Sequence, residues 1–371
     1  MTLGSLLYTD VEDDLRAAVS ALLTDRCRPS HVAALYDGVP VDAGLWQGIA
    51  HELGLAGLLV CEDLGGAGAS ARETAVVLEE LGRAVAPVPF LTSSVIATQV
   101  LLESGSDLVR GVASGQERAA LVVPWSTAPG RDLPQLSVAE GALCGRVRSV
   151  AGVLDADLLL VPVPGDAGVD LYAVRASEAD ARPVVSLDMS RPLADVDLTG
   201  AHGILIASGP PGAAAVQRGL MWGAGLLASE QLGVARWCFD TTLAYVKERR
   251  QFGRAVGGFQ AVKHRLADLF VQLEGAAAAA RYAAGALADD ADDVEVAVAV
   301  AQAYCSDIAV HVAEETIQLH GGIGMTWEHP AHLYLKRAKA GHIALGTAGW
   351  HRTRLADLVD LPASPANILA I

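Results

Sequence analysis

Residues 245–260 read YVKERRQFGRAVGGFQ, and residues 318–347 read QLHGGIGMTWEHPAHLYLKRAKAGHIALGT. The first segment ends a helical stretch at Arg249 and Arg250 and then passes into a glycine-containing turn. Two guanidinium groups at the C-terminal turn of a helix complement the negative end of its dipole. A guanidinium beside a glycine turn is also suited to bidentate phosphate binding. This segment by itself leaves both interpretations open.

The second segment contains a glycine-rich loop that follows a helical stretch. Gln318 precedes the loop Gly321-Gly322-Ile323-Gly324, where missing side chains let backbone amides approach a ligand closely. In a dinucleotide-binding GxGxxG motif the glycines follow a strand and open a helix. Here they close a helix, so the loop is not that motif.

The hydrophobic pattern changes twice along the chain and predicts three domains of an α+β protein. Residues 1–118 have helical periodicity, residues 119–207 have short β-type runs between Pro, Gly and Asp turns, and residues 208–371 return to helix. We therefore expect a helical N-terminal domain, a compact all-β middle domain and a C-terminal four-helix bundle with an extra terminal helix. Strands are predicted at 120–123, 158–161, 171–174 and 193–198.

The C-terminal third carries the clearest helical signals. One apolar face is predicted for the helix after the Gly257-Gly258 turn, made of Val262, Leu266, Leu269, Phe270 and Leu273. Further helices are predicted from about residue 292 to the glycine cap at 321, at 331–340 and at 347–359.

Composition excludes several classes of protein. The 371 residues carry a formal net charge of −16, so the surface repels nucleic acid and anionic membranes. The first residues lack the basic and apolar regions of a secretory signal, which predicts a cytoplasmic location and no membrane association. Five cysteines without a CxxC pair predict buried hydrophobic side chains rather than disulfides or zinc ligands. The histidines show no paired ligand spacing, so we expect no metal.

The two segments, in this order and at this spacing, resemble the acyl-CoA dehydrogenase family. A third stretch, residues 62–68, is similar to that family's acidic-x-x-Gly-Gly-x-Gly loop. The resemblance implies a helical N-terminal domain, a β-barrel middle domain and a four-helix bundle that associates as dimers or dimers of dimers, with FAD across the interface. It also implies an acyl-CoA or other acyl thioester as substrate, and an electron-transfer flavoprotein or similar acceptor.

Seven residues match cofactor-binding positions of that family. The resemblance implies that Arg249, Phe252 and Gln260 contact the FAD of a neighbouring subunit, with Arg249 on its pyrophosphate. Gln318, Gly321 and Gly322 match the positions that line the adenosine side. Thr347 matches the threonine that follows the catalytic glutamate and touches the cofactor.

The expected catalytic base is absent from both of its usual positions. In the family, a carboxylate removes the α-proton of an acyl thioester while the β-hydrogen leaves as hydride to flavin N5. Alignment through the glycine loop puts Leu345 at the usual glutamate, and the second known position falls at about Gly223. Glu230 lies about two helical turns further along the same face and is a weaker candidate, because buried carboxylates are more often paired structural groups.

These residues favour an FAD-dependent subunit of the acyl-CoA dehydrogenase kind that takes part in α,β-desaturation beside a glutamate-bearing partner. Two alternatives remain open: a self-sufficient homo-oligomeric dehydrogenase with a displaced base, and a non-enzymatic binding protein of the same fold. In the middle domain, Trp125 or Ser126 would border the flavin, although an aromatic residue beside a proline is ordinarily core packing. The pair Glu328 and His329 is interpreted as a structural anchor.

Overall fold

The N-terminal helices begin at polar caps. Thr9 Oγ1 accepts a hydrogen bond from the Glu12 N–H at 3.2 Å, and Ser70 Oγ accepts one from the Arg72 N–H at 3.1 Å. In both helices the glutamate at the third position bonds back to the cap's N–H, which completes a capping box. These caps fix the starts of the two longest helices of the predicted helical domain.

The computed structural model describes residues 6–361; residues 1–5 and 362–371, at the outer ends of the first and third expected domains, lie outside the described residues. The N-terminal helices are α1 (Asp10–Arg26), α2 (Pro29–Ala34), α3 (Ala43–Gln47), α4 (Ala71–Arg83), α5 (Thr98–Glu103) and α6 (Val109–Ala113). Short turns of helix join them: η1 (Leu35–Asp37), η2 (Gly48–Glu52), η3 (Leu55–Gly57), η4 (Glu62–Leu64) and η5 (Phe90–Ala97). The π-helical η5 runs directly into α5, and both pack against the long helix that follows the sheets.

The middle domain consists of small sheets that share one core. A four-stranded sheet has the order β1 (Ala119–Leu121), β5 (Leu158–Gly165), β6 (Gly168–Arg175), β9 (Gly203–Ala207). A three-stranded sheet has the order β4 (Arg146–Ala151), β8 (Leu193–Asp197), β7 (Asp180–Val184), and β2 (Ser137–Ala139) pairs with β3 (Ala142–Cys144). The turn η6 (Ala176–Glu178) lies between β6 and β7. All four predicted strand regions are confirmed.

Alternation along the strands explains how these sheets pack. In β8 the residues Ala194 and Val196 are buried while the aspartates beside them are not, as the period-two pattern predicts. Side chains from both larger sheets form one apolar cluster, including Val161 and Val174 from one sheet and Val147 and Val196 from the other. In the region of the expected β-barrel, two sheets pack face to face. Among residues 6–361 the paired strands do not close into a ring.

The C-terminal region is a bundle of long helices. Its elements are α7 (Pro210–Glu248), the hairpin β10 (Arg250–Gln251) and β11 (Arg254–Ala255), η7 (Val256–Gly258), α8 (Gln260–Ala288), α9 (Val294–His320), η8 (Gly321–Met325), α10 (Ala331–Ile343) and α11 (Ala348–Leu358). The 39-residue α7 is roughly 60 Å long and contacts all three domains. The predicted helices are thus confirmed.

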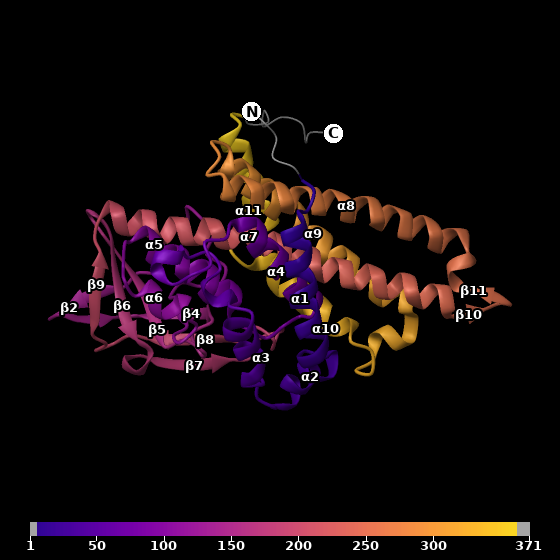
Figure 1. Ribbon diagram of the computed structural model, residues 1–371, viewed down its shortest axis with the longest axis horizontal. Helices are drawn as coiled ribbons and strands as arrows, with labels where there is room; N and C mark the ends of the chain where they lie inside the picture. The colour runs from indigo at the N-terminus through magenta and orange to yellow at the C-terminus, as the bar shows by residue number, and fades with distance from the viewer. Residues whose placement is uncertain (1–5, 362–371) are drawn as a thin grey trace, which may run out of the picture.

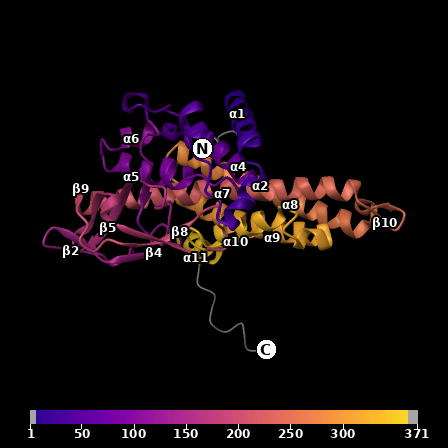
Figure 2. The same ribbon diagram turned by 90° about the horizontal axis from the view of Figure 1, so that it is seen from below.

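The long helices carry the sheets at one end and the β10–β11 hairpin at the other (Figure 1). Seen from below, the N-terminal helices lie along one side of α7, and α9 and α10 lie along the other (Figure 2). The segment 294–325 is apolar and long enough to cross a bilayer, but 67% of its most apolar window is buried inside the protein. Core packing accounts for that composition.

Two details differ from expectation. Phe270, predicted on the buried face of α8, is 50% exposed and meets Phe239 with ring centroids 6.0 Å apart. Phe239 lies on α7, so the Phe270 ring contacts α7 while half of the side chain stays exposed. Cys61 and Cys144 are exposed rather than buried, because both lie in surface segments.

Candidate functional site

A tight hairpin positions the first group of predicted cofactor residues. The strands pair Arg250 with Ala255 and Gln251 with Arg254, which leaves Phe252 and Gly253 as a two-residue turn. Both have positive φ, 52° and 79°, as a type I′ turn requires. This turn holds the Phe252 ring out from the bundle, where it is 91% exposed.

The glycine loop lies beside that hairpin. Gly321, with φ of 65°, ends α9, and the Tyr245 hydroxyl donates to the His320 carbonyl at 3.3 Å. The Tyr245 ring also stacks on the His320 ring, with centroids 4.4 Å apart. The ends of α7 and α9 are therefore adjacent. Six of the seven predicted residues belong to the segments at these two ends: Arg249, Phe252, Gln260, Gln318, Gly321 and Gly322.

All six of these residues are exposed, and their chemistry suits a nucleotide. Among residues 6–361 the Arg249 guanidinium has no ion-pair partner, so its donors are free for a phosphate. An exposed aromatic ring, two amide side chains and a backbone without Cβ atoms can contact a sugar and a purine. The nucleotide end of FAD therefore fits this surface, which we call the bundle end.

Thr347 lies elsewhere. It is the N-cap of α11, where Thr347 Oγ1 accepts a hydrogen bond from the Trp350 N–H at 3.3 Å. The preceding Gly346 faces Ala128 of the middle domain, since a Cβ at Gly346 would lie 2.8 Å from the Ala128 Cβ. The structure thus does not bring Thr347 to the bundle end.

The two customary base positions meet at one place. A Cβ built on Gly223 would lie 3.1 Å from Leu345 Cδ1 and 2.6 Å from Ile96 Cγ1. Leu345 comes from the loop before α11, Gly223 from α7 and Ile96 from η5. The cleft where the three domains meet is therefore the place at which the family chemistry would occur.

This cleft contains no carboxylate and very little space. Its volume is about 10 Å³, and it is lined by Thr92, Ile96, Leu121, Val123, Trp125, Ala151, Leu220 and Leu345. Such a volume holds about one water molecule. The side chains that line the cleft therefore leave little open space in it.

The backbone around Leu345 is held in place although its side chain is inert. Leu345 has φ of 52°, uncommon for a residue with a Cβ. Its N–H donates to the Trp125 carbonyl at 2.8 Å, and its carbonyl lies 3.0 Å from His351 Nε2. Burial lowers the pKa of His351 to about 4, although the hydrogen bond to Leu345 opposes that shift, so the neutral ring serves as donor.

Glu230 lies in a buried network with two arginines. Arg191 donates to both of its oxygens, at 3.0 and 2.5 Å, and Arg337 Nη1 donates to Oε1 at 3.0 Å. Burial alone would raise the pKa of Glu230, but Arg191 and Arg337 outweigh it and lower the pKa to about 2. A carboxylate with both oxygens bound to guanidiniums is a poor proton acceptor.

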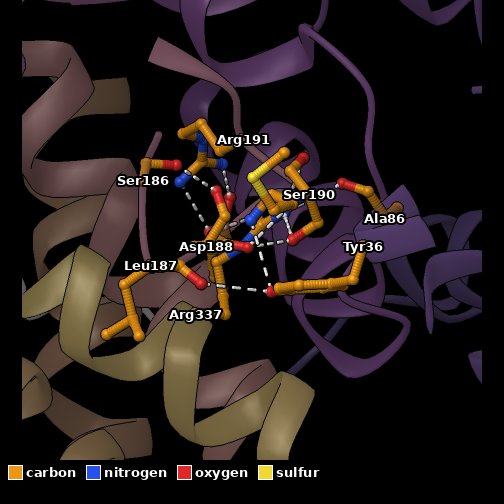
Figure 3. A network of polar contacts seen from close by, with 10 residues as sticks. Tyr36, Ala86, Ser186, Leu187, Asp188, Ser190, Arg191 and Arg337 are labelled. Atoms are coloured by element: carbon orange, nitrogen blue, oxygen red, sulfur yellow. Dashed lines mark hydrogen bonds and ion pairs between the residues drawn. The ribbon is translucent and has the colours of Figure 1, made fainter. Parts of the chain in front are cut away.

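The same network joins all three domains (Figure 3). Arg337 Nε lies 2.8 Å from Asp188 Oδ2, and Arg337 Nη2 donates to Ser190 Oγ at 2.9 Å and to the Ala86 carbonyl at 3.3 Å. The Tyr36 hydroxyl donates to the Leu187 carbonyl at 3.3 Å. Ala86 and Tyr36 belong to the N-terminal domain, the residues from 187 to 190 to the middle domain, and Arg337 to α10 of the bundle.

Sequence reasoning missed this network. Arg337 lies in the basic run Lys336-Arg337-Ala338-Lys339, a composition typical of a solvated helix face, yet Arg337 is only 3% exposed. The position of Arg337 in the helix could have indicated its burial. It lies three residues after the buried Tyr334, on the inward face of α10. No comparable pattern in the sequence indicated that Arg191 pairs with a buried carboxylate.

The loop from Trp327 to Pro330 makes ring contacts with other elements. The Trp327 ring meets the Tyr36 ring with centroids 5.9 Å apart, and the His329 ring lies 4.2 Å from the His320 ring. Burial and the nearby rings of His320 and His332 lower the pKa of His329 to about 4. These ring contacts are consistent with the interpretation of His329 as a structural residue.

Comparisons with known proteins agree with this geometry. The family model for the acyl-CoA dehydrogenase N-terminal domain matches residues 9–111, and the model for the acyl-CoA dehydrogenase C-terminal domain matches residues 211–359. Acyl-CoA dehydrogenase IpdE2 of Mycolicibacterium smegmatis is 36% identical over 90% of this chain and 93% of its own length. Acyl-CoA dehydrogenase FadE34 of Mycobacterium tuberculosis is 39% identical over 84% of this chain, which spans 41% of that longer protein.

Two solved structures are similar over nearly the whole chain. A variant of the Tcur3481-Tcur3483 steroid ACAD superposes with a TM-score of 0.83 at 30% identity, covering 95% of this chain and 98% of that one. The ChsE4-ChsE5 complex from Mycobacterium tuberculosis gives 0.85 at 26% identity, covering 97% and 100%. Each is named for two components.

Proposed function

The chain belongs to the acyl-CoA dehydrogenase family of FAD-dependent oxidoreductases that act on CH–CH groups, and from that premise we propose that it is the non-catalytic subunit of a hetero-oligomeric member. In this proposal it takes part in α,β-desaturation of an acyl thioester, while an unlike subunit supplies the glutamate. The observation that carries the proposal is the meeting of Gly223 and Leu345 in one apolar cleft.

The bundle end is this subunit's contribution to the reaction. FAD, when bound, accepts the hydride that leaves the β-carbon. Arg249 would hold the pyrophosphate, and Gln318 with the two glycines after His320 would line the adenosine. Because these groups are exposed at the bundle end, whereas the chain's own cleft lies where the three domains meet, they support binding of a cofactor whose reactive ring lies in the partner subunit.

The structure favours this proposal over a self-sufficient enzyme. That alternative needs a free carboxylate in the cleft, and its candidate, Glu230, is bound by Arg191 and Arg337. The names of the two similar structures support an assembly of unlike subunits and a bulky substrate of the steroid type. We extend both features to this protein as part of the proposal.

The test is to purify the tagged chain from its native host and determine its subunit composition, flavin content and acyl-CoA-dependent reduction of an artificial electron acceptor. We expect an unlike subunit with a glutamate at the position of Leu345, bound FAD, and activity only in the complex. A preparation containing copies of this chain alone that turns over would support the self-sufficient enzyme. A colourless, inactive preparation that stays so after FAD is added would support a binding protein.

A further inference from the structure

The stack of Tyr245 on His320 continues as a row of rings that ends at the N-terminal domain. The His320 ring lies 4.2 Å from the His329 ring. The Trp237 ring lies 6.5 Å from the His329 ring and stacks on the Tyr334 ring at 3.5 Å. The Tyr334 hydroxyl donates to the carbonyl of the last residue of α4 at 2.7 Å. The two histidines are thus in the middle of a packed row.

His320 joins the two segments of the bundle end. It directly precedes Gly321, and Tyr245, on which it stacks, lies about one helical turn before Arg249. His320 is 3% exposed, whereas Gly321 and Arg249 are at the surface. The buried ring therefore fixes where the glycine loop lies relative to Arg249.

The neutral His320 ring carries its proton on Nδ1. This atom lies 2.7 Å from the Thr316 carbonyl oxygen, which can only accept a hydrogen bond. Among residues 6–361, His320 Nε2 is buried and has no hydrogen-bond partner. A second proton would lie on Nε2 and leave a buried, charged N–H group unsatisfied, which costs free energy.

His329 has the opposite tautomer and also disfavours a second proton. Its Nδ1 accepts a hydrogen bond from the Ala331 N–H at 3.2 Å, at the first residue of α10. A proton on Nδ1 would break this bond. If His320 were protonated as well, two cations would lie side by side. The two rings therefore pack in this arrangement as neutral groups.

The groups around the two histidines do not compensate a positive charge. Their adjacent titratable side chains are Tyr245 on α7, Glu328 in the loop, and His332 with Lys336 on α10. Glu328 is exposed, and Lys336 Nζ, 3.4 Å from His332 Nδ1, adds a further positive charge. In the part of the chain that the structure describes, no carboxylate forms an ion pair with His320 or His329.

Carboxylates on adjoining turns of α7 and α9 pair with other cations: Asp240 with Arg83, Glu314 with Lys339 and Glu315 with Arg265. Burial accordingly lowers the pKa of both histidines, although the hydrogen bond to Thr316 opposes the shift of His320.

We propose that His320 and His329 are positioning residues that hold the glycine loop against the end of α7 only while both rings are neutral, so that the bundle end binds FAD at neutral pH and releases it in acid. The inference rests on the proposed cofactor role of the bundle end and adds control by pH to it. The two rings act through the backbone that they support, because a protonated ring gains free energy when it leaves the row and reaches water.

The experiment titrates FAD into the native complex, freed of cofactor, and follows flavin fluorescence. We expect an affinity roughly three- to tenfold weaker at about pH 5.5 than at about pH 7, because affinity for a state that excludes one proton falls at most tenfold per pH unit. An affinity that does not change over this range would overturn the proposal.

Variants separate the protons from the packing. His320→Phe combined with His329→Phe keeps both rings but removes both sites of protonation, so binding at neutral pH should persist while its dependence on pH is lost. His320→Ala should weaken binding at both pH values, because it removes the ring. The matched control is His311→Phe on the exposed side of α9, which should keep the dependence on pH. A folded double variant, checked by circular dichroism, that keeps this dependence would overturn the assignment to the two histidines.

Hydrogen exchange of residues 321–325 gives a measurement that needs neither a variant nor bound FAD. After correction for the intrinsic effect of pH on exchange, protection of this loop in the complex should decrease in acid. Unchanged protection would overturn the proposal and leave the proposed function intact. A complex that binds no FAD at either pH, although protection of the loop responds to acid, would instead contradict the proposed function and the proposal with it.

Discussion

Glu230 shows how an environment decides the role of a single residue. By position it is the nearest carboxylate to the expected base, but two guanidiniums bind its oxygens. Removing a buried carboxylate that balances two buried cations leaves both cations unpaired, and the same contacts lower its basicity. Proximity along a helix therefore does not indicate catalysis here.

We predict that Glu230→Gln lowers the free energy of unfolding by about 3–5 kcal/mol, because it leaves Arg191 and Arg337 buried without their counter-charge. Chemical denaturation followed by circular dichroism measures this change. The matched control is Glu314→Gln, which breaks an exposed pair with Lys339 and should cost less than about 1 kcal/mol. Equal effects of the two changes would contradict the structural role of Glu230.

The lowered pKa of Glu230 makes the free energy of unfolding depend on pH. Its pKa is about 2 in the folded state and 4.5 ordinarily, so the unfolded chain binds its proton first as the pH falls. The stabilisation is present above about pH 4.5 and is lost as the pH falls towards 2. Unfolding midpoints in urea between pH 6 and 2 should fall less steeply for Glu230→Gln than for the unchanged protein.

At the scale of elements, the loop before α11 depends on a neutral histidine. The pKa of His351 is lowered by burial from 6.5 to about 4, so the unfolded state takes up a proton between these values while the folded state does not. Stability should therefore decrease as the pH falls from about 6.5 to about 4. His351→Gln should weaken that decrease, whereas His202→Gln, at an exposed position, should leave it unchanged.

The β10–β11 hairpin and the glycine loop together form the bundle end, the surface at which we expect FAD to bind. Arg249→Ala should weaken FAD binding by the complex roughly 10- to 150-fold, the loss expected when hydrogen bonds to a charged group are removed. Arg249→Lys should lose an intermediate amount, because an ammonium lacks the planar fork of donors. Flavin fluorescence during titration measures both affinities.

The control for Arg249 is Arg354→Ala. Arg354 is an arginine on α11 that pairs with exposed Glu295, and α11 lies away from the bundle end. Its removal should leave the FAD affinity unchanged. An unchanged affinity in Arg249→Ala would remove this residue from the cofactor site.

The whole molecule is joined at Arg337, which contacts all three domains through one side chain. We predict that Arg337→Met separates the unfolding of the middle domain from that of the bundle, because Asp188 and Glu230 then lose a shared buried cation. Differential scanning calorimetry should show one transition for the unchanged protein and two for the variant. A single transition in both, shifted only in temperature, would contradict this role.

Local patterns predicted most of the fold. Strand alternation around Asp195 and Asp197, and the glycine stop at Gly321, depend on neighbours within a few residues, so the sequence contains them directly. The family resemblance predicted that Arg249 and Gln318 both bind the cofactor. The contact of the Tyr245 ring with the His320 ring shows that the ends of α7 and α9, which carry these residues, are adjacent. The prediction that Phe270 is buried was wrong, because the exposure of its side chain depends on how α8 is rotated against the neighbouring helices.

The sequence by itself determined the order of domains, the positions of the helices and the absence of a base at Leu345 and Gly223. Only the tertiary structure decided that these two positions meet beside Ile96, and that Glu230 is bound by Arg191 and Arg337. The physical reason is how far apart in the sequence the interacting residues lie. Helix caps and alternation act between near neighbours, whereas a cleft and a buried ion-pair network depend on contacts between residues far apart in the sequence, 39 positions for Arg191 with Glu230 and 107 for Arg337 with Glu230.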